Sequence, residues 1–198
     1  DLAQLPSVLR RFTKDRSLLK EITLIDDLRG TATGRLVLSG SIESIRTKVD
    51  ISDFNLLVRH GRLPYPLEIA KGQFSYDGNK IGIQNLSGTV GKSSFSQINA
   101  KLSLEKAPYL EITSGKSSLS LGEIYPWLSS LKGIKDAVKD LKSVQGTVLL
   151  SSLGLKGPLS QPQKWDFRTT GEVKNLAVDS TLFPDRLTVT GVGFEATP

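Results

Sequence analysis

Apolar and polar residues alternate with a period of two along most of the chain. Phe74 and Tyr76 are separated by one serine, Ile81 and Ile83 are separated by one glycine, and Asp77-Gly78-Asn79 lies between the two pairs. A period of two is typical of β-strands, and Asp-Gly between two such runs predicts a tight hairpin because glycine tolerates positive φ. Similar short runs lie at 34–39, 67–69, 98–104, 109–112 and 119–121. The pattern predicts a meandering antiparallel sheet.

Two segments depart from this alternation and predict helices. Residues 2–20 carry apolar side chains at helical spacing. Residues 120–142 do the same, with an apolar stripe that runs from Trp127 to Leu141. Ser120 and Glu123 have the spacing of a capping box at the start of this second helix. Gly133 weakens the middle and could divide the helix in two.

Four lysines flank the apolar stripe of the second predicted helix. They are Lys132, Lys135, Lys139 and Lys142, and each follows an apolar residue of the stripe. A basic amphipathic helix of this kind can lie on an anionic membrane surface. The alternative is a helix packed on the sheet, with its lysines at the border with solvent.

The chain also contains an internal repeat. Gly34-Arg-Leu-Val-Leu resembles Gly146-Thr-Val-Leu-Leu, and Asn55-Leu56 resembles Asn175-Leu176. A predicted helix precedes each set of strands. We therefore expect a first helix-plus-β unit at 1–121 and a second, truncated unit at 122–198, continuous with the first sheet.

Composition adds few constraints. The chain of 198 residues has 38% hydrophobic and 23% charged residues, which indicates a globular protein. It has neither cysteine nor methionine and begins with Asp1, so we expect a fragment of a longer protein, with any membrane anchor outside it. The net charge of +6 permits attraction to phosphate-bearing partners, but a solubilising surface is the favoured interpretation.

The residues that chemistry requires are sparse, so the sequence predicts a protein that is not an enzyme and has neither a metal site nor a cofactor. The single histidine, His60, lies in a loop-like segment. Gly91-Lys92-Ser93 resembles the end of a phosphate-binding loop, but Leu86 stands where that loop needs glycine, so a glycine hairpin turn is the better interpretation. Aromatic residues are 7% and are not interleaved with basic ones, so we expect no nucleic-acid binding.

The ordered succession of these motifs resembles the AsmA-like superfamily of bacterial envelope proteins, which includes the TamB group. The motifs are Gly34 to Gly40, Asn55-Leu56, Leu63 to Ile69, Gly72 to Gly78 and Ile81 to Ser93, followed by Gly157 to Pro162 and Trp165-Asp166-Phe167. The resemblance covers most of residues 22–198. It implies a mainly β fold with about two helices, in which the antiparallel sheet curves into a groove built from repeated helix-plus-strands units.

The same resemblance implies a function and a location. It implies a periplasmic segment of a protein anchored in the inner membrane, which carries phospholipid toward the outer membrane. The alternative is a structural or protein-interaction module in outer-membrane biogenesis, with other envelope proteins as partners. The candidate lipid-binding residues are Leu67, Ile69, Phe74, Tyr76, Ile81, Ile83, Ile98 and Leu102. The sequence leaves open whether these side chains line a groove or fill a core under a helix.

Overall fold

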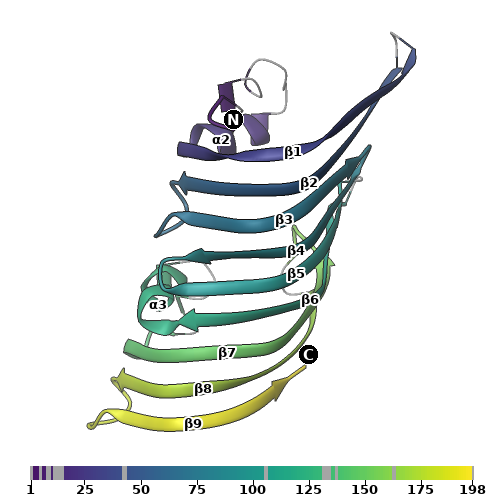
Figure 1. Cartoon of the computed structure of the whole chain (residues 1–198). Helices are drawn as coiled ribbons and strands as arrows, with labels where there is room; N and C mark the ends of the chain where they lie inside the picture. Colours follow the sequence, from purple (N-terminus) through teal and green to yellow (C-terminus); the bar gives the residue numbers. More distant parts are fainter. Residues whose placement is uncertain are drawn as a thin grey trace.

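In the residues that a computed structural model describes, nine strands form one open sheet in the order β1 to β9, each antiparallel to its neighbours (Figure 1). The structure describes residues 2–4, 6–7, 10, 16–41, 44–104, 107–130, 135–136, 138–161 and 164–197. The strands are β1 (Ile25–Ser41), β2 (Ser44–His60), β3 (Leu67–Asp77), β4 (Lys80–Val90), β5 (Ser93–Ser103), β6 (Tyr109–Ser120), β7 (Leu141–Pro158), β8 (Asp166–Ser180) and β9 (Leu187–Ala196). The mainly β, antiparallel meander expected from the alternation is therefore confirmed, and the sheet is curved, as the resemblance implies (Figure 1).

The tight turns lie where glycine permits them. Asp77 pairs with Lys80 across the β3–β4 hairpin, and Gly78 has a φ of 60°. Gly91, in the segment that resembles a phosphate-binding loop, has a φ of 58° in the β4–β5 turn. Both turns need a left-handed residue, which glycine supplies without a steric penalty.

The two helices whose bounds the structure describes, α2 and α3, lie at one end of the sheet (Figure 1). Helix α2 (Arg16–Thr23) contacts β1, and its Ile22 is 2% exposed. It extends beyond the predicted limit at residue 20, while residues 3–4 form a turn and 11–15 lie outside the described part of the chain. Helix α3 (Leu121–Ser130) follows β6 directly. No helix in the described part is long and apolar enough to cross a bilayer.

The prediction of one helix over 120–142 is wrong in its second half. Helix α3 ends at Ser130, Lys135 and Lys139 lie in turns, and Lys142 is an exposed residue of β7. Lys132 lies outside the described residues. Pairing with β8 explains the difference, because Leu141 lies opposite Ser180 and the strand register continues from there. Tertiary pairing thus overrides the helical spacing, and the basic amphipathic helix is not formed at the three described lysines.

Candidate functional site

The sheet has one continuous apolar face. In an antiparallel pair, residues directly opposite each other project to the same side. Phe74 lies opposite Ile51 on one side and Ile83 on the other, and Ile83 lies opposite Ala100. The row continues through Ile112 of β6 to Leu155 and Phe167. We call this side of the sheet the apolar face.

The candidate lipid-binding residues all belong to this apolar face. Tyr76 lies opposite Ile81, and Ile81 lies opposite Leu102. Nearer the helices, Leu67 and Ile69 pair with Val58 and Leu56 of β2. Ile98 lies opposite Leu86. The strand register places all of the candidates on the apolar face: Leu67, Ile69, Phe74, Tyr76, Ile81, Ile83, Ile98 and Leu102.

A row of β-bulges crosses the sheet and keeps the apolar side chains together. Ala32 pairs with Phe54 and Gly34 pairs with Ile51, so β2 contains one residue more than β1 between these pairs. Phe54 and Ile51 are three positions apart yet share one face, which strict alternation forbids. Further irregularities lie at Asn85 and Gln97, whose φ angles are 50° and 54°. The bulges correct the register where the simple alternation would move apolar residues to the other side.

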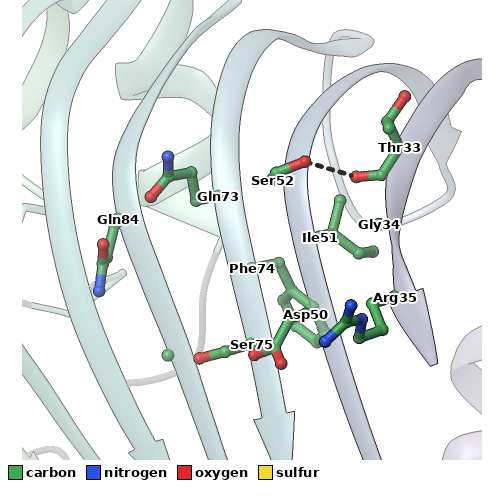
Figure 2. Close-up of a pocket in the computed structure, with 11 residues that line it drawn as sticks. Thr33, Gly34, Arg35, Asp50, Ile51, Ser52, Gln73, Phe74, Ser75 and Gln84 are labelled. Carbon is green, nitrogen blue, oxygen red and sulfur yellow. Dashed lines mark hydrogen bonds between the residues drawn. The ribbon is translucent and has the colours of Figure 1, made fainter. Parts of the chain in front are cut away.

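Polar side chains bond to groups near these bulges. The Asn85 backbone N–H donates to Oδ1 of Asn99 at 3.0 Å, and Nδ2 of Asn99 donates to Oγ of Ser114 at 2.8 Å. On β2, the extra residue Ser52 donates to the carbonyl of Thr33 at 3.1 Å, as Figure 2 shows. A bulge interrupts the regular ladder, so nearby amide and hydroxyl groups satisfy backbone groups that it leaves free.

Most of the apolar face is not covered by the described helices. The candidate residues are all half-buried, and the described core is limited to Ile22, Val58 and Ala100. The main helix contacts involve β1, β6 and β7. The protein exposes 13516 Å² of surface, whereas a compact monomer of 21.5 kDa would expose about 9,200 Å². A single-layer sheet explains this large area.

The opposite face of the sheet is polar and carries an alternating row of charges. Lys101 lies opposite Glu111, Glu111 opposite Lys156, and Lys156 opposite Asp166. The Lys156 ammonium lies 3.1 Å from an Asp166 oxygen. Its hydrogen bond and charge interaction with Asp166 raise the pKa of Lys156, with smaller contributions from Tyr109 and Glu111. Both side chains are about half exposed, so water screens the pair.

Two shallow depressions lie side by side on the polar face. One, of about 540 Å³, is lined by Arg35, Asp50, Gln73 and Gln84, among others (Figure 2). The second, of about 560 Å³, includes Tyr109 and shares Ser75, Gly82 and Gln84 with the first. Polar side chains line both depressions, but apolar atoms supply more of their exposed surface, and Ile81, Ile83 and Leu102 also contribute to the lining of the second.

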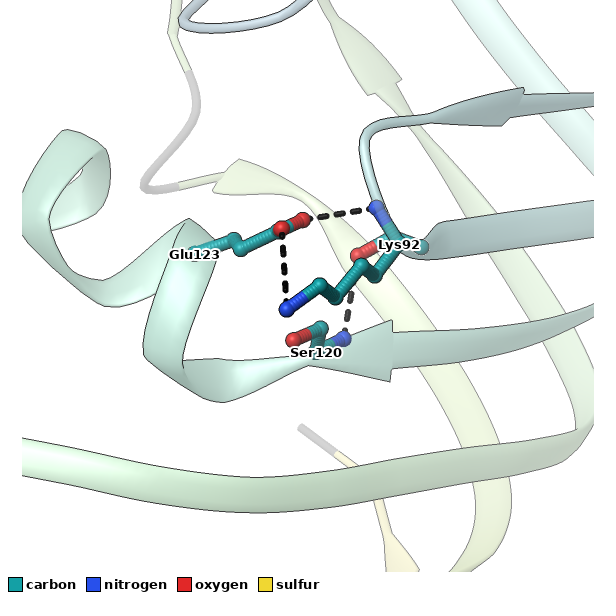
Figure 3. A network of polar contacts seen from close by, with 4 residues as sticks. Lys92, Ser120 and Glu123 are labelled. Atoms are coloured by element: carbon teal, nitrogen blue, oxygen red, sulfur yellow. Dashed lines mark hydrogen bonds and ion pairs between the residues drawn. The ribbon is translucent and has the colours of Figure 1, made fainter.

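Helix α3 caps one end of the sheet instead of covering its face. Its Glu123 carboxylate accepts from the Lys92 backbone N–H at 2.6 Å and lies 3.9 Å from the Lys92 ammonium (Figure 3). The Ser120 backbone N–H donates to Oγ of Ser93 at 3.0 Å. The predicted capping box between Ser120 and Glu123 is therefore replaced by bonds to the β4–β5 turn and to β5. Trp127 Nε1 donates to the Arg62 carbonyl at 3.0 Å, which ties the helix to the β2–β3 loop.

Among the described residues, the side chains that catalysis or metal binding would need do not lie together. His60 is the last residue of β2 and half-buried, and its Nδ1 accepts from the Arg62 backbone N–H at 3.3 Å. In the part of the chain that the structure describes, no group of three acidic or histidine side chains is arranged to hold a metal ion.

Comparisons with protein-family models, with curated proteins and with solved structures found no match to this chain. The geometry of the two faces is therefore the basis for the functional argument.

Proposed function

We propose that this chain is a segment of an AsmA-like periplasmic protein whose apolar face binds the acyl chains of phospholipids and conducts them between the inner and outer membranes. The parent protein would be anchored in the inner membrane outside this segment. One observation carries the proposal: a continuous apolar face crosses the sheet, and the described helices leave most of it uncovered. Large exposed apolar surfaces are rare on soluble monomers unless they bind something.

The dimensions of the face suit an acyl chain. Strand β4 has 11 residues, so it spans roughly 36 Å at about 3.3 Å per residue. The hydrocarbon layer of one membrane leaflet is roughly 15 Å thick, half of a core of about 30 Å. A lipid tail therefore fits along one strand, and each methylene removed from water contributes about 0.8 kcal/mol.

The repeat supports a sheet that extends by units. The β8–β9 register repeats the β2–β3 register at an offset of 120 residues, as in Leu56↔Ile69 and Leu176↔Val189. The correspondence holds wherever both registers are assigned between Thr169↔Ala196 and Val178↔Leu187. A Cβ on Gly30 would meet the Asn55 carbonyl oxygen at 2.1 Å, and one on Gly146 would meet the Asn175 oxygen at 2.8 Å. By this geometry Gly146 is the equivalent of Gly30 in the repeat, whereas the sequence pattern aligned it with Gly34. We propose that α2 with β1–β3 and α3 with β7–β9 are repeated units.

Photo-crosslinking tests the lipid proposal. A photoreactive amino acid at Ile83 or Leu102 of the apolar face should crosslink to co-purified phospholipid, identified by mass spectrometry. The matched positions Gln84 and Lys101 follow or precede these residues on the same strands but project to the polar face. Lipid adducts that are absent from the apolar positions, or equally abundant at the polar positions, would contradict the proposal.

A second candidate function, a protein-interaction module, is favoured by the outer edge of β9. Within the described residues, no strand pairs with that edge. Envelope proteins with exposed strands would then be the partners. Lipid crosslinks that fail from both faces, together with a protein captured at β9, would favour this second function.

A further inference from the structure

We propose that the polar face binds a neutral oligosaccharide in a trough that crosses the strands, with Gly82 at its centre. The trough consists of the two depressions of the polar face, which share Ser75, Gly82 and Gln84. It lies on the opposite side of the sheet from the candidate lipid-binding residues. Binding there is additional to lipid binding at the apolar face and does not depend on it.

Gly82 lies inside β4, an interior strand, where packing within the protein does not require a glycine. Its φ is outside the left-handed region, and a Cβ would meet only the Ser75 side chain within 4 Å, whose hydroxyl can rotate. On the same strand, by contrast, a Cβ on Gly88 would lie against the Glu68 carbonyl oxygen and the Phe95 ring. Glycine inside a strand weakens the strand and often marks a place where a ligand approaches the backbone. The bare backbone at the centre of the trough is such a place.

Four side chains that line the trough offer hydrogen-bonding groups that the protein does not use. Gln73 lies opposite Gln84 across β3 and β4, and Lys101 lies opposite Glu111 across β5 and β6. Within the described residues none of the four makes a hydrogen bond or an ion pair, and Figure 2 shows the two glutamines without a partner among the residues drawn. An amide both donates and accepts, as a sugar hydroxyl does. The side chains near Gly82 therefore complement the hydroxyl groups of a sugar.

The charges along the trough cancel, and much of the remaining surface is apolar. The lining contains three cationic and three anionic side chains: Arg35, Lys80, Lys101, Asp50, Asp77 and Glu111. A polyanion or a polycation would therefore meet as many like charges as opposite ones. Apolar atoms supply more of the exposed surface than polar atoms do, and Tyr109 in the lining is 42% exposed. A sugar ring has an apolar C–H face and an edge of hydroxyl groups, so a neutral oligosaccharide matches both features.

The dimensions of the trough suit a chain of several sugar rings. The two depressions, of about 540 and 560 Å³, are within the range of roughly 300–1,000 Å³ that small-molecule sites occupy. The lining runs from Arg35 of β1 to Glu111 of β6, which are five strand spacings apart. At about 4.8 Å per spacing the trough is roughly 24 Å long, which exceeds the length of a single sugar ring.

Isothermal titration calorimetry of the full chain tests the proposal with three neutral hexasaccharides, namely maltohexaose, laminarihexaose and chitohexaose. At least one of them should bind saturably, with a Kd below about 1 mM. Gly82→Val should weaken that binding at least about tenfold, because the branched side chain fills the centre of the trough. Ser94→Val is the matched control, since Ser94 is an exposed residue of the polar face that lines neither depression. Its binding should stay within about twofold of the parent protein.

A second variant and two charged probes complete the test. Gln84 is exposed, so Gln84→Ala should fold even where Gly82→Val does not, and loss of its amide should weaken the same binding about fivefold. Hexagalacturonic acid and phosphocholine should bind at least about tenfold more weakly than the best neutral hexasaccharide. The proposal is overturned if none of the three hexasaccharides binds, or if a folded trough variant binds as tightly as the parent. Equal or tighter binding of hexagalacturonic acid would also overturn it, and equal or tighter binding of phosphocholine would assign the trough to a lipid head group instead.

Discussion

The two faces of one sheet differ in how tightly the chain constrains them. On the apolar face, side chains and bulges meet across every strand, and Ala100 is only 8% exposed at its centre. On the polar face, charges alternate across neighbouring strands, and the Lys156–Asp166 ion pair is about half exposed, so solvent screens it. A single-layer sheet therefore concentrates its folding energy and its proposed lipid-binding surface on the same side. Substitutions in matched pairs, one on each face, can separate these contributions.

The largest difference between the faces is expected at neighbouring positions of β5. Ala100→Asp would place a carboxylate between Ile83 and Ile112, where burial of an unpaired charge costs roughly 3–5 kcal/mol. Lys101→Asn changes an exposed residue of the polar face and should shift stability by at most about 0.5 kcal/mol. Urea unfolding monitored by circular dichroism measures both. Equal destabilisation by the two substitutions would show that the faces are not energetically distinct.

Glycines offer a second comparison, with a smaller effect. A Cβ on Gly88, on the apolar face, would lie 2.1 Å from the Glu68 carbonyl oxygen and 2.8 Å from the Phe95 ring. Gly88→Ala should therefore destabilise the protein by about 1–3 kcal/mol, because backbone must move. On the polar face, a Cβ on Gly82 would meet only the Ser75 side chain within 3.5 Å, and its hydroxyl can rotate. Gly82→Ala should be within about 1 kcal/mol of the parent protein by the same measurement.

The sequence predicts the strands better than it predicts the faces. Alternation and turn glycines identify most of β3 to β6, because these signals are local. The bulges at Ser52 and Asn85 have no comparable local signal, since their effect depends on which residues lie opposite. The second half of the predicted helix fails for the same reason: its spacing is helical, but β8 supplies a partner strand to Leu141. Long-range pairing decided both outcomes.

For the candidate site too, the sequence predicts what is local to one strand and not what depends on pairing between strands. Alternation within each strand places Phe74 with Tyr76 and Ile81 with Ile83 on common faces. It does not show that Ile98 or Leu67 joins them across a bulge, which the register supplies. Nor does it show that α3 lies at the end of the sheet, because bonds such as that between Trp127 and Arg62 join residues 65 positions apart.

A third comparison is made at the end of the sheet, between the two residues that join α3 to the β4–β5 turn. The Glu123 carboxylate accepts the Lys92 backbone N–H, so Glu123→Ala should cost about 1 kcal/mol and loosen the helix from the β4–β5 turn. The Lys92 side chain is 82% exposed, so Lys92→Ala should have little effect although it removes the ion pair. Hydrogen exchange of the Lys92 amide should accelerate in the first variant only. Acceleration in both would assign the contact to the ion pair and not to the backbone bond.

The smallest expected effect is a pH dependence on the polar face. Asp166 raises the pKa of Lys156, so folding favours the protonated ammonium. The sign follows from linkage: the stabilisation is fully present below the unfolded lysine pKa of about 10.4 and is lost as pH rises through the higher folded value. The melting temperature of the Asp166→Asn protein should therefore lie slightly below that of the parent at neutral pH and converge with it in strong alkali. A difference in melting temperature that instead grows with rising pH would contradict this assignment. A difference as large as that caused by Ala100→Asp would mean that the polar face carries folding energy comparable to that of the apolar face.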